Sequence, residues 1–166
     1  MKKLLYILLG TAATICLSAC DDNGKNGGGG NSGGGTDDNV TAEVTYSVAG
    51  GEDILSLFDI TATYTDETGS RKEQKLTSLP CDITLSTIET LPFEAAVSLT
   101  LTERPEYPDK EKYTVGLAIG ISYELSNGKQ YSSLSLNTQQ FSKDKIDAYK
   151  KIVMDKKWES AVTVEE

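Results

Sequence analysis

The chain has 166 residues, of which 25 are acidic and 16 basic, and its formal net charge is −9 with no histidine. An acidic surface repels phosphate backbones, so nucleic-acid binding is not expected. The missing histidine excludes Ser-His-Asp and Cys-His catalysis, histidine-ligated zinc and a histidine pH switch. Chemistry that uses only carboxylates or tyrosine remains open.

The first residues have the pattern of a secretion signal. A lysine pair precedes an apolar stretch at residues 4–17, and the stretch ends in Leu17-Ser18-Ala19-Cys20. It holds about 14 residues, whereas a membrane-spanning helix needs about 20. Small residues follow it at the cleavage position of a signal peptide. We therefore expect residues 1–19 to be removed from the mature protein.

The end of this segment resembles the lipobox of bacterial lipoproteins, in which the signal peptide is cleaved before a cysteine whose thiol carries lipid. The resemblance implies that Cys20 is the first mature residue and holds a diacylglyceryl anchor, usually with a third acyl chain. One acyl chain binds a bilayer only weakly, whereas several give lasting attachment. The expected partner of this end of the chain is therefore a membrane.

The two residues after the cysteine bear on which membrane surface this is. Asp21 and Asp22 resemble the acidic export signal that takes Bacteroidetes lipoproteins to the outside of the outer membrane. The whole chain is similar to the small surface lipoproteins of these bacteria, which implies a place on the cell surface. In enteric bacteria an aspartate here resembles an inner-membrane retention signal, so a periplasm-facing anchor remains the alternative. Neither resemblance implies a ligand-binding or catalytic residue.

Residues 20–39 follow as a segment rich in glycine, asparagine and aspartate, with no apolar side chain after Cys20. Such a composition cannot bury enough surface to form a core, so we expect a flexible tether. A Gly-rich chain of about 19 residues spans roughly 24 Å on average. The spacing of its acidic residues does not match a calcium-binding loop, and we expect no metal site.

Residues 40–166 are enough for a single domain. From Val40 to Val48 every second residue is apolar, which is the pattern of a half-buried strand. Further strands are predicted at residues 58–64, 70–77, 81–85 and 93–101. The segment 70–77 is mostly polar and charged, which suits an edge strand. Cys81 begins one of the others; we expect a buried thiol there, and no disulfide because it has no partner once Cys20 carries lipid.

The best-specified unit is a hairpin. Alternating apolar residues run from Tyr113 to Leu125, and Asn127-Gly128 follows, a dipeptide that favours a two-residue type I′ turn. That turn would place Ile121 opposite Leu134 and bring the apolar faces of the two strands together.

Small residues occupy the other face of the first hairpin strand, at Gly116, Ala118 and Gly120. Such a face lets another part of the structure approach the backbone closely. We interpret it as the contact for a second layer, such as the C-terminal helix. A ligand lying on the sheet is the alternative.

After Phe141 the apolar residues recur at steps of three and four, at Ile146, Tyr149, Ile152 and Val153. This spacing predicts a helix over residues 142–155, with Ser142 as its N-cap. A last strand is predicted at residues 158–164, where apolar alternation resumes.

Together these elements predict an all-β-dominated fold. We expect an immunoglobulin-like β-sandwich of about seven strands with one C-terminal helix. The alternative is an α+β fold in which the helix covers one face of an antiparallel sheet.

No catalytic constellation is evident. The acidic pairs fall at predicted turns and strand ends, where carboxylates are usually solvated: Glu52 with Asp53, Asp66 with Glu67, and Glu103 with Glu106. We expect a membrane-anchored, non-catalytic binding or adhesion module whose ligand is a glycan or a protein. A carboxylate- or tyrosine-based enzyme and a periplasmic structural protein remain the alternatives.

Aromatic side chains are the candidate ligand contacts, namely Tyr131, Tyr107 and Trp158. Rigid rings suit both stacking against sugars and contact with proteins. Tyr131 is expected on the outer face of the hairpin, opposite Glu124. We expect no cofactor.

Overall fold

A computed structural model of the chain describes residues 40–166. The predicted signal peptide (1–19), the lipid-bearing Cys20 and the predicted tether (20–39) lie outside the described residues. The elements follow in the order β1 (Ala42–Gly50), α1 (Ile54–Leu57), β2 (Phe58–Thr65), β3 (Arg71–Leu76), β4 (Cys81–Ile88), β5 (Phe93–Glu103), β6 (Lys112–Val115), β7 (Leu117–Leu125), β8 (Gln130–Ser132), β9 (Gln139–Ser142), a 3-10 turn (Lys143–Lys145), α2 (Ile146–Asp155) and β10 (Glu159–Val164).

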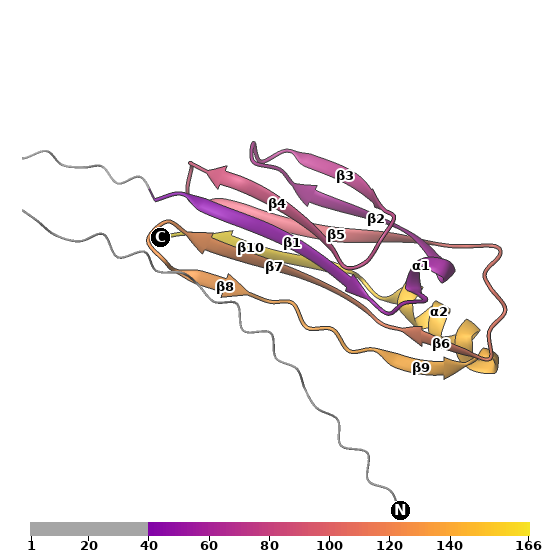
Figure 1. Cartoon of the computed structure of the whole chain (residues 1–166). Helices are drawn as coiled ribbons and strands as arrows, with labels where there is room; N and C mark the ends of the chain where they lie inside the picture. Colours follow the sequence, from indigo (N-terminus) through magenta and orange to yellow (C-terminus); the bar gives the residue numbers. More distant parts are fainter. Residues whose placement is uncertain (1–39) are drawn as a thin grey trace, which may run out of the picture. The chain divides into compact units, whose positions relative to one another are not determined.

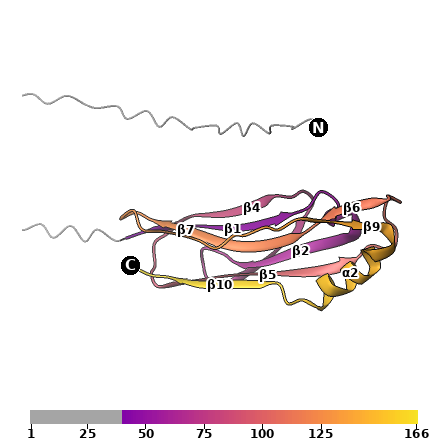
Figure 2. The same ribbon diagram turned by 90° about the horizontal axis from the view of Figure 1, so that it is seen from below.

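Two four-stranded antiparallel sheets pack face to face (Figures 1 and 2). One has the strand order β4-β1-β7-β8 and the other β10-β5-β2-β3, while β6 and β9 form a separate two-stranded ribbon. The connections β1–β2, β3–β4 and β4–β5 each pass from one sheet to the other, as in Greek-key sandwiches. The predicted all-β-dominated sandwich with one C-terminal helix is confirmed.

The core lies between the two sheets and follows from the alternation of the strands. In β1 the side chains of Val44, Tyr46 and Val48 are fully buried, while Thr45 and Ser47 between them are partly exposed. The hydroxyl of Tyr46 donates to the Thr65 carbonyl at 2.7 Å, so the buried phenol keeps a partner. Strand β3 is an edge strand with exposed charges, as its composition predicted.

The hairpin has a different register from the predicted one. Tyr123 lies opposite Tyr131, and the Leu125 N–H donates to the Lys129 carbonyl at 2.8 Å across a three-residue loop. Gly128, at φ +89°, supplies the left-handed position that ends such a loop. The longer loop moves the register by one residue, so Tyr131 shares a face with Tyr123 and not with Glu124.

The second hairpin strand also ends early. Strand β8 has three residues, and Leu134 and Leu136 beyond it are 40% and 39% exposed instead of buried opposite β7. The predicted long first strand is divided at Gly116 into β6 and β7, and β6 pairs with β9.

The small-residue face of β7 is covered by the chain's own backbone, in the segment 133–138 after β8. A Cβ added to Gly120 would lie 2.7 Å from the Leu134 Cα, and one added to Gly116 would lie 2.6 Å from the Asn137 carbonyl oxygen. The close approach is therefore made by this segment. The helix, which the sequence suggested as the covering layer, lies elsewhere.

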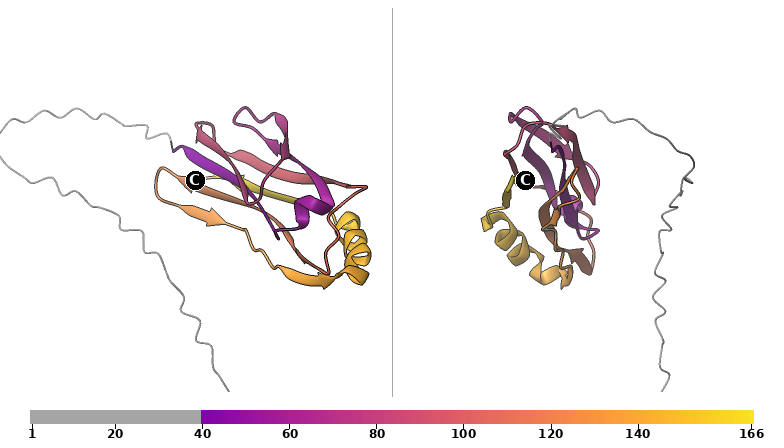
Figure 3. Two further views of the ribbon diagram at one scale, coloured as in Figure 1. Left: turned by 45° about the vertical axis from the view of Figure 1, so that its right-hand side comes forward. Right: turned by 90° about the vertical axis from the view of Figure 1, so that its left-hand side faces the viewer.

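Helix α2 lies at one end of the sandwich, beside β6 and β9 (Figures 1 and 3). The helical region covers 143–155, close to the predicted 142–155, but the Ser142 side chain makes no capping hydrogen bond. Ile146 and Val153 are buried, whereas Ile152 is 68% exposed. Within residues 40–166, no helix is long and apolar enough to cross a membrane.

Candidate binding groove beside helix α2

A groove of about 220 Å³ opens between α2, β9 and the start of β7. Its walls are largely aromatic and aliphatic, with Phe141 from β9, Tyr149 and Ile152 from α2, and Trp158 from the segment after the helix. Asn137 and Gln139 add amide groups to its lining, and Lys156 adds an ammonium group. No carboxylate lines this groove.

The end of α2 brings these side chains together. The helix stops at Asp155, which leaves the carbonyl groups of its last turn without helical partners. The Trp158 indole N–H donates to one of them, the Val153 carbonyl, at 2.9 Å. The tryptophan is thereby held against the end of the helix, partly buried, immediately before β10 begins.

Two further contacts fix the walls. The rings of Phe141 and Tyr149 pack with centroids 5.0 Å apart, across the turn at Lys143–Lys145. The Lys156 ammonium lies 3.9 Å from the centroid of the Trp158 ring, a cation–π contact that occupies that part of the ring face. The groove is therefore built by packing within residues 137–158 and against the first residues of β7.

The side chains of the groove are suited to binding a ligand by contact and hydrogen bonds. Burial raises the pKa of Tyr149 to about 12, so its phenol stays neutral at physiological pH. The amides of Asn137 and Gln139 can donate and accept hydrogen bonds without changing charge. Apolar walls with a few placed polar groups are typical of sites that hold a ligand by shape and hydrogen bonds.

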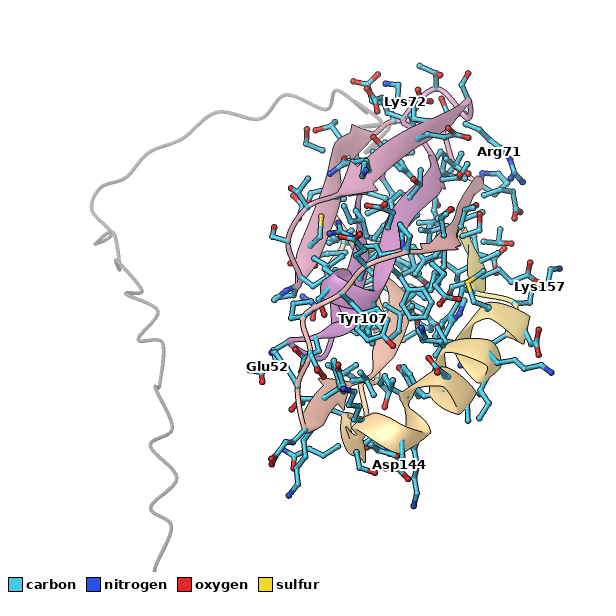
Figure 4. All side chains as sticks on the ribbon, turned by 90° about the vertical axis from the view of Figure 1, so that its right-hand side faces the viewer. Glu52, Arg71, Lys72, Tyr107, Asp144 and Lys157 are labelled. Atoms are coloured by element: carbon cyan, nitrogen blue, oxygen red, sulfur yellow. The ribbon has the colours of Figure 1, made fainter. Side chains whose placement is uncertain are left out.

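Of the three aromatic residues predicted as ligand contacts, Trp158 lies in this groove and Tyr107 does not. The Tyr107 ring packs edge-on against Tyr113 at 5.9 Å between centroids, and the Lys150 ammonium lies 4.4 Å from its centroid. Its hydroxyl is 3.4 Å from the Asp147 carboxylate. Tyr107 therefore spans from the segment after β5 to α2, among side chains of the domain itself (Figure 4).

Tyr131 lines neither the groove that holds Trp158 nor the cluster around Tyr107. Its ring stacks on Tyr123 with centroids 5.4 Å apart and an interplanar angle of 20°, and the residue is 42% exposed. Residue 131 also lines a shallow pocket of about 360 Å³ over β1, β7 and β8, but Glu43 and Thr45 in that pocket lie on the other face of the sheet from the Tyr123 and Tyr131 rings. One face of the Tyr131 ring is thus occupied by Tyr123.

The acidic pairs of the sequence do not form a paired-carboxylate site among the described residues. Asp53 is 2% exposed, accepts from the Thr114 N–H at 2.7 Å and pairs with Lys110, which ties α1 to β6. Asp66 is 3% exposed and accepts hydrogen bonds within its own turn. These two carboxylates are structural.

Two carboxylates do converge, but on a buried lysine. Lys150 Nζ lies 2.6 Å from Glu103 Oε1 and 2.9 Å from Asp147 Oδ1, and the lysine side chain is 7% exposed. Burial alone would lower the pKa of Lys150, but hydrogen bonds to Glu103 and Asp147 outweigh burial and raise it above its ordinary value. The same ammonium lowers the pKa of Asp147. The cluster fastens α2 to β5, and neither carboxylate lines the α2 groove.

Sequence reasoning selected Trp158 but missed the side chains that complete the groove. Phe141, Tyr149 and Lys156 were assigned to strand and helix patterns, and nothing local shows that they share a wall. Ile152 gave no local signal either, because it is adjacent to Val153 on the helix, and two adjacent positions can both fall within an apolar stripe of about 100°.

No protein-family model matches the chain, and no curated protein matches it. Within residues 40–166, no three Cys, Asp or Glu side chains gather as a metal site would require.

Proposed function

We propose that the chain is a lipid-anchored lipoprotein of the bacterial cell surface, whose domain is a non-catalytic binding module with its ligand site in the α2 groove. The observation that carries the proposal is the groove itself, where three aromatic side chains surround apolar space and Ile152 is 68% exposed at its border. Attachment through Cys20 and a flexible tether, both expected from the sequence, would present such a module to partners outside the cell.

The groove favours a protein ligand over a glycan. Sugars bind by stacking on flat, open ring faces, and the Lys156 ammonium already lies over the Trp158 ring. An exposed isoleucine gains most from contact with another apolar side chain, since burying it removes apolar area from water. The amides of Asn137 and Gln139 can bond to a peptide backbone.

A glycan is the second candidate, at a different place. Tyr131 is 42% exposed, and its ring is held flat by stacking on Tyr123. A fixed ring with one open face can stack on a sugar. The two candidates predict different critical residues, so one experiment separates them.

The test presents the full lipidated chain, in detergent, to a phage-displayed random peptide library and to a glycan array. For a protein ligand, the library should enrich peptides with apolar side chains, and Ile152→Asp should weaken the selected peptides tenfold or more, as expected for an apolar anchor. Tyr131→Ala is the matched control and should leave peptide binding unchanged. If the selected peptides bind the Ile152→Asp variant as tightly as they bind the parent chain, the groove is not their binding site. Binding confined to the array and lost in Tyr131→Ala assigns the glycan alternative.

A further inference from the structure

Four strands lie at the edges of the two main sheets, and three of them carry features that discourage pairing with another chain. Strand β3 exposes Arg71, Lys72, Glu73 and Lys75, and charged edge strands resist addition. Strand β8 is only three residues long. Strand β4 is irregular, with a register shift against β1 and a positive φ of 71° at Thr87.

Strand β10 has none of these protections. It is six residues long and pairs only with β5. After Glu159 it contains neither charge nor proline up to Val164, and Ala161 and Thr163 are exposed. A regular, uncharged edge of this kind is a template for another strand.

The unpaired backbone groups of β10 can be assigned. The Leu99 N–H donates to the Trp158 carbonyl at 2.9 Å, so the backbone groups of Trp158 point toward β5. Because antiparallel strands alternate, Ser160, Val162 and Val164 also bond to β5. The N–H and C=O groups of Glu159, Ala161 and Thr163 therefore point away from the sheet.

We propose that a second copy of this chain occupies this edge, with β10 paired antiparallel to β10 so that Ala161 lies opposite Ala161 of the second copy. In that register Glu159 lies opposite Thr163 of the second copy, and the three outward-pointing residues form three pairs with about six hydrogen bonds. Two four-stranded sheets then join into one of eight strands.

Opposite charges at the two ends of β10 favour both a second copy as the partner and this register. Lys157 precedes β10 and Glu165 follows it, and this register places each opposite the other residue of the second copy. Lys157 is 81% exposed and projects outward beside the end of α2 (Figure 4), where it also pairs with Glu159 at 2.7 Å.

The two neighbouring registers of the β10–β10 pair are less favourable in opposed charges or in the number of hydrogen-bonded pairs. Pairing must shift by two residues to keep the same faces together. A shift in one direction places Glu159 opposite Glu165, and directly opposed like charges are destabilising. A shift in the other direction keeps two of the three hydrogen-bonded pairs and sets Lys157 opposite Thr163. The strand is therefore complementary to itself in one register.

The first experiment is a cysteine cross-link in the full lipidated chain, on a Cys81→Ser background. Ala161→Cys should give a disulfide-linked dimer under mild oxidation, because the Cα atoms of a hydrogen-bonded pair lie about 5.5 Å apart, within disulfide range. Thr163→Cys is the matched control and should form no disulfide, since its opposite position in the second copy is Glu159. Equal cross-linking of both variants, or none in either, overturns the register.

The second experiment measures dimer dissociation of the full chain in detergent by analytical ultracentrifugation. Ala161→Lys places two lysines directly opposite each other and should weaken the dimer about tenfold or more. Thr163→Lys makes the same charge change but faces Glu159 of the second copy, so the dimer should be kept. A parent chain that is monomeric throughout the micromolar range, or two lysine variants that behave alike, overturns the proposal.

Discussion

The buried acidic residues show how single side chains hold the turns of this domain. Asp66 accepts hydrogen bonds from the Thr68 hydroxyl at 2.6 Å and from the backbone N–H groups of Thr68 and Ser70, and it pairs with Lys72 at 3.1 Å. The Thr68 hydroxyl bond, with the Lys72 ammonium and the backbone N–H groups, holds the pKa of Asp66 well below its ordinary value. The carboxylate that looked solvated in sequence is thus an organising element of the β2–β3 turn.

Asp66 should make stability depend on pH in a defined direction. Its folded-state pKa is lowered, so its contribution is present above the unfolded pKa of about 3.9 and is lost as pH falls through the folded pKa. We expect Asp66→Asn to lower the melting temperature at pH 7, and the difference from the parent to shrink below pH 4. Circular dichroism melts at a series of pH values measure this. Glu67→Gln, an exposed neighbour with the same charge change, is the control, and equal effects of the two would contradict the assignment.

Along β7, close backbone contact replaces regular strand pairing. Beyond the three pairs of β8, the chain leaves the ladder and lies against Gly120 and Gly116. The Ser133 side chain continues the contact by accepting from the Ile121 N–H at 2.9 Å and donating to the Ile121 carbonyl at 3.1 Å. Glycine is needed at these positions because the neighbouring backbone occupies the space that a Cβ would take.

Gly120→Ala should therefore destabilise the domain, although alanine is usually harmless in a strand. The added Cβ would lie 2.7 Å from the Leu134 Cα, so segment 133–138 must move. Overpacking of this kind costs about 1–3 kcal/mol, or several degrees in melting temperature for a domain of this size. Ser122→Ala, on the same face of β7, should change the melting temperature little. Unchanged stability of Gly120→Ala in urea or thermal melts would show that the segment gives way freely.

The sequence predicted where the strands lie better than it predicted which strands pair with each other. Strict alternation identified β1, β2, β5 and β7, because half-buried strands need a period of two. The hairpin register was wrong, because Asn127-Gly128 serves a three-residue loop as readily as the two-residue turn. The division at Gly116 and the pairing of β6 with β9 depend on residues more than twenty positions apart, and no local pattern reports such contacts. The groove was missed for the same reason, apart from Trp158.

The described domain is a small sandwich with its candidate binding groove at one end, and the proposed lipid anchor precedes the described residues. The lipoprotein proposal rests on the first 22 residues, namely the lysine pair, the short apolar stretch, Leu17-Ser18-Ala19-Cys20 and the acidic pair after it. It is therefore tested independently of anything in the domain.

Cys20→Ala should abolish incorporation of labelled fatty acid into the protein in growing cells, because the thiol is the expected attachment point. Cys16→Ala, inside the expected signal peptide, should leave labelling intact. Labelling that persists in Cys20→Ala contradicts lipidation at this residue. Protease treatment of intact cells then separates the two locations, since a surface protein is cut before lysis and a periplasm-facing one only after it.

Strand β1 begins at the end of the sandwich opposite α2, and its nine residues span about 30 Å (Figure 1). A single copy attached through this end can stand upright and hold its groove about that far from its point of attachment. Two copies joined antiparallel along β10 have their attachment points at opposite ends. The two grooves of the dimer would then lie at opposite ends as well, so one dimer could hold two ligands apart from each other.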